Sequence, residues 1–180
     1  MEALSFIIQH QLKEELQSHS RHSGGCINAV YRCITDIGIH VIKLNDTAQS
    51  SFMFSKEIRG LNLLGKSTFR TPKIHGTGEF ENWSYLILEC IDNSGADLDP
   101  ILFGKNLAKM HQMTADSFGL DHDNFIGSME QINKKHTNWS DFYASQRLEP
   151  LVRTAYHKGH LNKNELQLFE VFYQKLKDLI

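Results

Sequence analysis

A continuous β-favouring run covers residues 84–89, where four apolar residues follow one another between a serine and a glutamate. A half-buried strand alternates apolar and polar residues, whereas a strand that is apolar at every position is buried on both faces of its sheet. This run therefore predicts a central, doubly covered strand. A helix predicted over residues 3–17 has apolar residues at spacings of three and four, and we expect it to pack on the back of that sheet.

Strands dominate the first part of the chain and helices the second. The polar, turn-rich residues 90–95 follow the central strand and mark the expected boundary. The order predicts an α+β fold in two parts, with an antiparallel-sheet small lobe over residues 1–91 and a partial, all-helical large lobe over residues 92–180. The other predicted elements are two strands joined by a glycine turn within 23–36, strands at 39–44 and 73–78, helices at 52–64, 98–113, 139–158 and 162–180, and an irregular segment at 114–135.

Composition argues against several classes of protein. The net charge is −2, whereas a general nucleic-acid-binding protein has an excess of basic residues. No apolar run is long enough to span a membrane. The first residues have neither the basic start nor the apolar core of a secretory signal. Three cysteines make no disulfide framework, and the ten histidines show no metal-ligand spacing. We therefore expect a cytoplasmic protein with no metal site in this chain and no nucleic-acid or membrane partner.

A glycine-containing turn, a strand lysine and a helix glutamate follow one another in the first 60 residues. Glycine lets the main chain approach phosphate oxygens closely, so the N–H groups of such a turn can cradle them. Lys43 can reach the phosphates from its strand, and Glu57 on the next helix can hold it in place. Each feature alone is typical of an ordinary turn or a solvated charge, but their order predicts a nucleotide site. The turn consists of Gly24, Gly25, Cys26, Ile27 and Asn28.

The same order of elements is found in the small lobe of protein-kinase-like folds, where the central strand leads into a hinge that pairs with adenine. On this resemblance the C=O group of Glu89 and the N–H group of Ile91 pair with the base. Leu88 lies behind them and Cys90 between them. We therefore predict a protein-kinase-like fold that binds ATP through this hinge, the glycine turn, Lys43 and Glu57.

Cys26 has two interpretations of about equal weight. A free cysteine is usually a small buried apolar residue. Nearby amide N–H groups and Lys43 could instead make a thiol in the phosphate turn reactive. Such a thiol could link two copies of the chain through a disulfide and block the nucleotide. Cys33 and Cys90 are expected to be core or hinge residues.

A compound motif runs through the irregular segment and into the next helix. It is preceded by Glu57-x-x-Gly60-Leu61 and by a Leu-Ala-x-x-His pattern at residues 107–111. The compound motif consists of Phe118, Gly119, Leu120, Asp123, Asn124, Ile126, Gly127, Gln131, Asn133, Trp139, Phe142, Arg147 and Leu148. With the glycine turn, these residues resemble the fructosamine (ketosamine-3-) kinase family from about Gly24 to about Arg153.

The resemblance implies ATP-dependent phosphorylation of the third-position hydroxyl of a ketosamine. A ketosamine is a sugar attached to an amine, often a lysine side chain, and the substrate can be a small molecule or part of a protein. The phosphorylated adduct breaks down and frees the amine, which is deglycation. The resemblance assigns Lys43 to the α- and β-phosphates, Glu57 to orienting Lys43, and the hinge to adenine. Magnesium is expected with the complete enzyme.

The sequence departs from the family at the catalytic loop. The family's His-Gly-Asp-x-x-x-x-Asn loop and later Asp-Pro do not occur in it: the His-Gly pair at residues 75–76 is followed by threonine, and the run at residues 122–124 matches the family's Asp-Asn segment. Phosphoryl transfer needs a carboxylate near the acceptor hydroxyl and ligands for magnesium. We therefore expect no catalytic residue in this chain, a base beyond Ile180 and no transfer by the chain alone. Asp123 and Asn124 are expected to cap a helix rather than touch substrate.

Two other functions fit parts of the pattern. A non-catalytic, pseudokinase-like protein would also carry the nucleotide residues without the catalytic loop. A related aminoglycoside or choline kinase would share the Leu-Ala-x-x-His pattern. The presence of Gln131, Asn133 and Trp139 favours a ketosamine kinase over the second of these.

Overall fold

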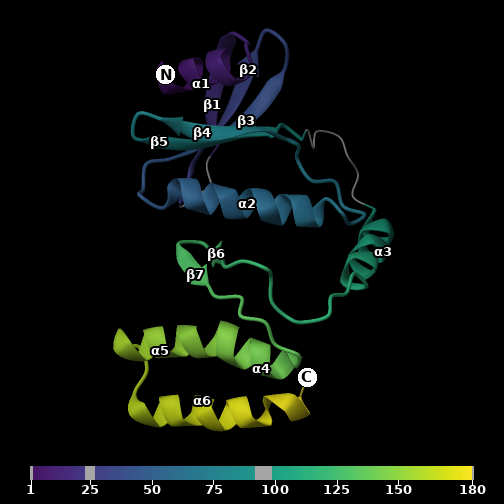
Figure 1. Cartoon of the computed structure of the whole chain (residues 1–180), viewed down its shortest axis with the longest axis vertical. Helices are drawn as coiled ribbons and strands as arrows, with labels where there is room; N and C mark the ends of the chain where they lie inside the picture. The colour runs from purple at the N-terminus through teal and green to yellow at the C-terminus, as the bar shows by residue number, and fades with distance from the viewer. Residues whose placement is uncertain (1, 23–26, 92–98, 180) are drawn as a thin grey trace. The chain divides into compact units, whose positions relative to one another are not determined.

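The computed structural model describes residues 2–22, 27–91 and 99–179 (Figure 1). The chain divides into two compact units, Met1–Met113 and Thr114–Ile180. The lobe boundary expected after residue 91 stays a prediction, because residues 92–98 lie outside the described part.

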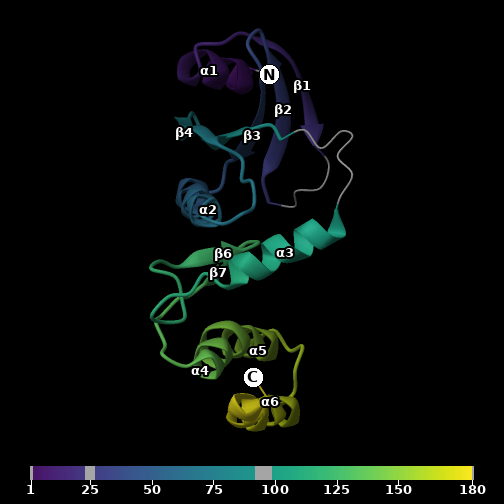
Figure 2. The same cartoon turned by 90° about the vertical axis from the view of Figure 1, so that its right-hand side faces the viewer.

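An antiparallel sheet of five strands forms the centre of the first unit. Its elements are α1 (Glu2–Gln11), β1 (Leu16–His22), β2 (Ala29–Thr35), β3 (Ile39–Asn45), α2 (Ser50–Leu64), β4 (Ile74–Phe80), β5 (Trp83–Glu89) and α3 (Pro100–His111). The strand order is β1-β2-β3-β5-β4. β5 lies between two neighbours and its five middle residues are buried, which confirms the predicted doubly covered strand. Helices α1 and α2 lie on opposite sides of the sheet (Figures 1 and 2).

Alternation along β5 divides the core between the two faces of the sheet. Tyr85 and Ile87 pack on the α1 side, and Leu86 and Leu88 pack with Phe54 on the α2 side. Both helices therefore bury an apolar stripe against the same strand, and the strand has no face left for solvent. The remaining buried residues of the α1 side are Leu4, Ile7, Ile8, Cys33, Ile42 and Leu44.

The helix predicted over residues 3–17 is too long. α1 ends at Gln11, Lys13 has a left-handed φ of 62°, and Leu16 begins β1. The side chain of Glu14 accepts a hydrogen bond from Thr35 (2.6 Å) and contacts the His40 ring nitrogen Nε2 (2.8 Å), so contacts with β2 and β3 turn the chain out of the helix. β1 itself is a polar edge strand that pairs with β2 through its backbone. Because its residues do not alternate between apolar and polar, the sequence pattern did not predict this strand.

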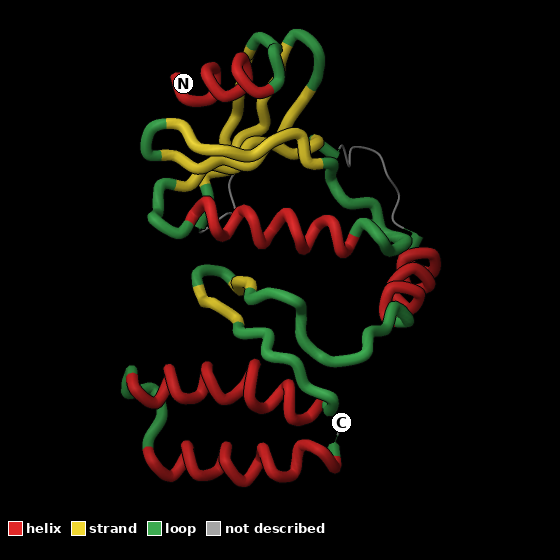
Figure 3. The backbone as a smooth tube through the Cα atoms, in the orientation of Figure 1, coloured by secondary structure: helices red, strands yellow, loops and turns green. Residues whose placement is uncertain are grey.

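The second unit contains a short hairpin followed by helices (Figure 3). The hairpin was not anticipated in the segment predicted to be irregular, because its strands have three residues each. α5 and α6 pack against each other, and the side chain of Asn162 caps α6 by accepting from the N–H group of Glu165. The elements are β6 (Asn124–Ile126), β7 (Met129–Gln131), α4 (Trp139–Tyr143), a π-helical turn (Ala144–Leu148), α5 (Glu149–His157), α6 (Lys163–Lys175) and a 3₁₀ turn (Leu176–Asp178).

The single helix predicted over residues 139–158 is interrupted by the π-helical turn. Pro150 near the start of α5 has no N–H group to donate to the carbonyl four residues earlier. That carbonyl, of Gln146, accepts a hydrogen bond from the guanidinium group of Arg147 instead (2.9 Å). The proline therefore explains the local change in helical period.

Gly119 is expected to be intolerant of a side chain. Its φ is +102°, and a Cβ atom there would lie 2.9 Å from the Asn133 carbonyl oxygen and 3.2 Å from the Phe142 ring. We expect Gly119→Ala to lower the free energy of unfolding of the second unit by about 1–3 kcal/mol from the backbone alone, and by more through the contact with the carbonyl. Urea denaturation followed by Trp139 fluorescence, in a Trp83→Phe background, measures this.

Gly159 provides the matched control for that substitution. It also has a positive φ, +75°, but a Cβ atom there would meet nothing within 4 Å. Gly159→Ala therefore introduces the backbone cost without the close contact. Equal losses in the two variants would show that the packing around Gly119 contributes nothing.

Candidate functional site

Lys43 on β3 and Glu57 on α2 form an ion pair, with Nζ 2.5 Å from Oε1. Lys43 stands between Ile42 and Leu44, whose side chains enter the α1-side core, so the alternation of the strand directs Lys43 to the α2 side. The two side chains are 25% and 29% exposed, and partial burial reduces the screening of their attraction by solvent. The glutamate thus holds the ammonium group in place. The nucleotide-binding role assigned to the pair stays a prediction.

The position of Glu57 depends on how α2 is anchored. Phe54 lies one turn earlier on the helix, is 1% exposed and packs against Leu86 and Leu88 of β5. Leu86 is also the β5 residue opposite Lys43 in the β3–β5 pairing. One buried contact therefore fixes the helix that carries the glutamate against the strand next to the lysine.

Asn45 is a residue of this region that the sequence analysis missed. Its side chain is buried and donates from Nδ2 to the side chain of Asn28 (2.7 Å) and to the carbonyl of Ile27 (3.2 Å). Its Oδ1 accepts from the N–H group of Thr47 (2.8 Å). Asn45 thereby ties the end of the predicted phosphate turn to the end of β3. The sequence signal for this role was a polar residue at the end of a strand rich in β-branched residues, and such a signal is weak.

The predicted hinge begins where β5 ends. Leu88 is buried in the α2-side core, while Cys90 and Ile91 are half-exposed. The Glu89 carboxylate accepts hydrogen bonds from Lys73 N–H (3.1 Å) and from Arg70 (2.6 Å), and these two groups lower the pKa of Glu89. The side chain of Glu89 therefore fixes the end of the strand, and the predicted pairing with adenine concerns only its main chain.

Part of the predicted phosphate turn lies outside the described residues. Gly24, Gly25 and Cys26 belong to that part, so the reactive thiol and the disulfide-linked dimer predicted through Cys26 stay predictions. Cys33 is buried, as expected of a core residue, and burial raises the pKa of its thiol to about 11. Cys33 is therefore an unreactive thiol at neutral pH.

Asn133 and Arg147, two residues of the compound motif, form a hydrogen-bonded network in the second unit. The buried Asn133 amide donates to the carbonyl of His122 and to the side chain of Asn124, both at 2.9 Å, and accepts from Arg147. The Arg147 guanidinium stacks over the Phe142 ring at 4.6 Å, and burial lowers its pKa. These motif residues hold the hairpin and the helices together.

Asp123 and Asn124 do not cap a helix, in contrast to the expectation. Asp123 accepts from the N–H group of Asn133 across the hairpin (2.7 Å), and Asn124 accepts from its side chain. The run Asp-His-Asp-Asn resembles a capping sequence, but it opens into β6. Both residues therefore stabilise the base of the hairpin.

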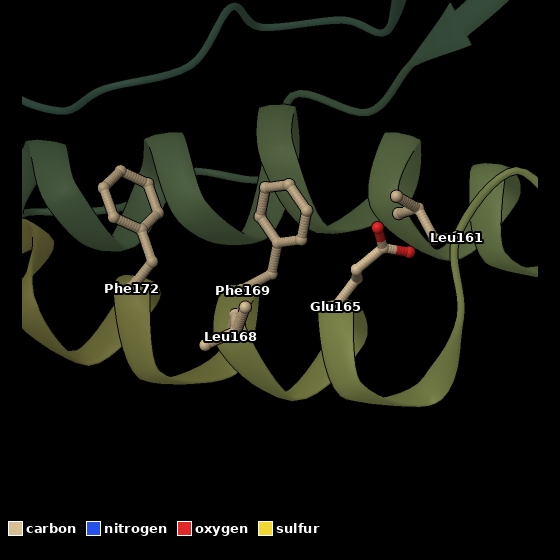
Figure 4. A pocket seen from close by; sticks show the side chains of 5 residues that line it. All are labelled: Leu161, Glu165, Leu168, Phe169 and Phe172. Carbon is tan, nitrogen blue, oxygen red and sulfur yellow. The ribbon is translucent and has the colours of Figure 1, made fainter.

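An apolar hollow of about 400 Å³ lies on α6 (Figure 4). Phe169 and Phe172 project from the helix into it on the side of α5, with Leu161 and Leu168 beside them. Its acidic residue, Glu165, already accepts from the N–H group of Asn162 (2.7 Å). The hollow therefore offers apolar contact and little that would bind a phosphate or a sugar.

Neither a metal cluster nor a membrane-crossing helix is found in residues 2–22, 27–91 and 99–179. No group of three or more His, Cys, Asp or Glu side chains there is placed to hold a metal ion. No helix in these ranges is long and apolar enough to cross a bilayer. We assign no ligand for magnesium among these residues.

An antiparallel sheet whose lysine pairs with a glutamate on the following helix defines the small lobe of the protein-kinase-like folds. The first unit has this arrangement. A sequence profile described as fructosamine kinase matches residues 1–179. The chain belongs to the fructosamine kinase family, as the compound motif indicated.

Individual relatives agree with this assignment. An Arabidopsis thaliana protein named protein-ribulosamine 3-kinase, chloroplastic, is 37% identical over 161 residues, covering 82% of this chain and 49% of that protein. A Lactiplantibacillus plantarum protein named probable ketoamine kinase is 33% identical over 163 residues, covering 91% and 55%. A candidate fructosamine-3-kinase of known structure from Thermobifida fusca matches with a TM-score of 0.83 at 26% identity, covering 99% and 62%. The chain spans about half the length of the curated relatives it matches.

Proposed function

We propose that this chain supplies the nucleotide-binding part of an ATP-dependent kinase that phosphorylates the third-position hydroxyl of fructosamine- or ribulosamine-type ketosamines. The observation that carries the proposal is the Lys43–Glu57 ion pair on the α2 side of the sheet. Membership of the fructosamine kinase family supports a ketosamine, small or protein-bound, as the acceptor. The phosphorylated adduct then breaks down and frees the amine, so the biological role is deglycation in the cytoplasm.

The residues of the first unit bind and orient ATP in this function. Lys43 donates from its ammonium group to the α- and β-phosphate oxygens, and Glu57 restricts its rotation toward solvent. Charge-assisted hydrogen bonds of this kind are about twice as strong as neutral ones. The main chain of Glu89 and Ile91 pairs with adenine, beside the buried Leu88 side chain. Magnesium, when bound, neutralises charge on the phosphates.

A non-catalytic nucleotide-binding role is the second candidate. It would use the Lys43–Glu57 pair of the nucleotide site without a carboxylate to accept the proton of an attacking hydroxyl. Both candidates require ATP binding, and they differ in whether phosphate is transferred.

The test uses the 180-residue chain with ATP and magnesium. Isothermal titration calorimetry is expected to show saturable ATP binding at one site. Phosphorus NMR with fructosyl-lysine as acceptor is expected to show no phosphorylated sugar. A chain that does not bind ATP would contradict the nucleotide site, and a robust magnesium-dependent transfer would contradict the expectation that the catalytic carboxylate is missing.

A further inference from the structure

Two histidine side chains meet across the end of β5, the strand that leads into the predicted hinge. Nδ1 of His40 on β3 lies 3.0 Å from Nδ1 of His75 on β4. β5 lies between these two strands in the sheet, so the contact spans it. His40 is the β3 residue opposite Glu89, the last residue of β5. This histidine pair therefore links the two strands that flank the start of the hinge.

The ring of His40 is held in place by the segment between α1 and β1. Its side chain is 8% exposed, and Nε2 lies 2.8 Å from Oε2 of Glu14. The same carboxylate oxygen accepts a hydrogen bond from the hydroxyl group of Thr35 on β2 (2.6 Å). The contact with His75 therefore starts from a buried ring whose other nitrogen is already engaged.

The two contacts of His40 determine how many protons the histidine pair can carry. An ionised carboxylate only accepts, so Glu14 holds a proton on Nε2 of His40. In the neutral pair, Nδ1 of His40 then accepts from the Nδ1–H group of His75. One added proton on Nε2 of His75, an exposed residue, leaves this bond intact. A second added proton puts hydrogen on both Nδ1 atoms, so the two cationic rings repel each other and the contact is lost.

The groups around the histidine pair favour its less protonated state. Desolvation of the ring lowers the pKa of His75, and the neighbouring His40 lowers it further. The carboxylates of Glu89 and Glu14 oppose this shift without reversing it. The other titratable groups that face the pair are Lys73 just before β4, Arg70 on the Glu89 carboxylate and Cys33 opposite His40 on β2.

The start of β4 is also bonded directly to the first residue of the hinge. The N–H group of Glu89 donates to the carbonyl of Lys73 (2.8 Å), and the N–H group of Lys73 donates to the Glu89 carboxylate (3.1 Å). His75 follows two residues later, within a register shift of the β4–β5 pairing. Strand pairing is locally disrupted at such a shift. The histidine contact therefore adds a link where the backbone ladder is interrupted.

We propose that His40 and His75 are positioning residues of the nucleotide site and that they make its affinity for ATP depend on pH. With the contact in place, the main chain of Glu89 keeps the position in which it pairs with adenine. When the second proton binds, the contact is lost, this end of the sheet loosens and ATP affinity falls. The inference rests on the proposed function for the identity of the ligand, and on the sheet of the first unit for the histidine pair.

The experiment measures the ATP affinity of the 180-residue chain, with magnesium, at about pH 7.5 and about pH 5.5, on either side of the ordinary histidine pKa of about 6.5. Phosphate groups also titrate near pH 6, so the reference is the same pair of titrations with His75→Asn. The asparagine amide can still donate to Nδ1 of His40, and it does not titrate. Between the two pH values the unchanged chain is expected to lose about 3- to 10-fold more affinity than this variant, the value of one hydrogen bond.

Two further variants separate the contact from its protonation. His75→Ala removes the contact at both pH values, so its affinity should already be low near neutral pH and should show only the pH dependence of His75→Asn. His19→Asn alters an exposed histidine on β1 of the same sheet and should keep the pH dependence of the unchanged chain.

Hydrogen exchange tests the histidine pair without any ligand. The N–H group of Glu89, which donates to the carbonyl of Lys73, reports on the end of β5. Its protection, taken relative to an unstructured chain so that the intrinsic pH dependence of exchange cancels, is expected to fall from the higher to the lower pH. In His75→Asn the protection should stay constant.

The outcomes separate this inference from the proposed function. If ATP affinity changes equally with pH in the unchanged chain and in His75→Asn, the inference is wrong and the nucleotide site stands. A chain that binds no ATP at either pH contradicts the proposed function, and the protection of the Glu89 N–H group then decides on the histidine pair alone. Constant protection in the unchanged chain would overturn the pair as well.

Discussion

ATP affinity is expected to fall by about 10- to 150-fold when Lys43 is replaced by alanine, because a hydrogen bond to a charged group contributes about 1.5–3 kcal/mol. Lys43 is the cation that the first unit holds in place on the α2 side of the sheet, through its ion pair with Glu57. Its side chain is only a quarter exposed, but it lies outside the apolar clusters on the two faces of the sheet, so the substitution removes no residue of those clusters. Calorimetric titration of the 180-residue variant with ATP and magnesium measures the effect.

Two further variants test whether a loss of ATP affinity comes from Lys43 in its ion pair or from the removal of any lysine. Glu57→Gln keeps a hydrogen-bond acceptor and removes the charge, so we expect an intermediate loss of ATP affinity. Lys66→Ala removes an exposed lysine just beyond α2 and should leave affinity unchanged. If Lys43→Ala and Lys66→Ala bind ATP equally well, the phosphates do not lie near Lys43 and the proposed site is wrong.

Phe54→Ala is expected to lower the free energy of unfolding of the first unit by about 3–5 kcal/mol, the usual cost of truncating a buried phenylalanine to alanine. Phe54 is 1% exposed and packs on Leu86 and Leu88. The cavity would also loosen the helix that carries Glu57, so ATP affinity should fall in this variant as well. Urea denaturation followed by Trp83 fluorescence, in a Trp139→Phe background, measures stability.

Phe52→Ala is the matched control on the same helix. Phe52 is 47% exposed and lies under the ammonium group of Lys56, 4.3 Å from the ring centroid. Because its ring is half exposed, its truncation should cost clearly less than that of Phe54, with about 1 kcal/mol of the loss from the exposed cation–π contact. Similar losses for Phe52→Ala and Phe54→Ala would show that α2 is not anchored by its buried face.

Long apolar patterns predicted their elements well. The run at residues 84–89 became β5, and the stripe that includes Phe54 became α2, because burial on a core requires the same periodic spacing in the sequence as in the fold. The pairing of Lys43 with Glu57 was also predictable, since it depends on a strand and a helix that both have clear patterns. The family followed from motif residues and not from periodicity.

Short or polar elements were not predictable in this way. β1 is an edge strand with an almost wholly exposed face, and the strands of the hairpin have three residues each. Backbone hydrogen bonds to a neighbouring strand hold β1 and the hairpin strands in place. These bonds do not depend on a particular pattern of side chains, so the sequence pattern does not predict them. The error at the end of α1 has the same cause, because Leu12 and Leu16 continue the helical spacing while the chain has already turned toward β1.

The sequence by itself determined the α+β class, the central strand, the lysine–glutamate pair and the family, because each depends on local periodicity or on residue identity. Only the tertiary structure decided that Asn45 ties the end of the predicted phosphate turn to β3 and that Asp123 pairs across a hairpin. Those features are contacts between atoms of residues that are distant in the sequence. The packing of the whole unit determines such contacts, and residue spacing along the chain does not predict them directly.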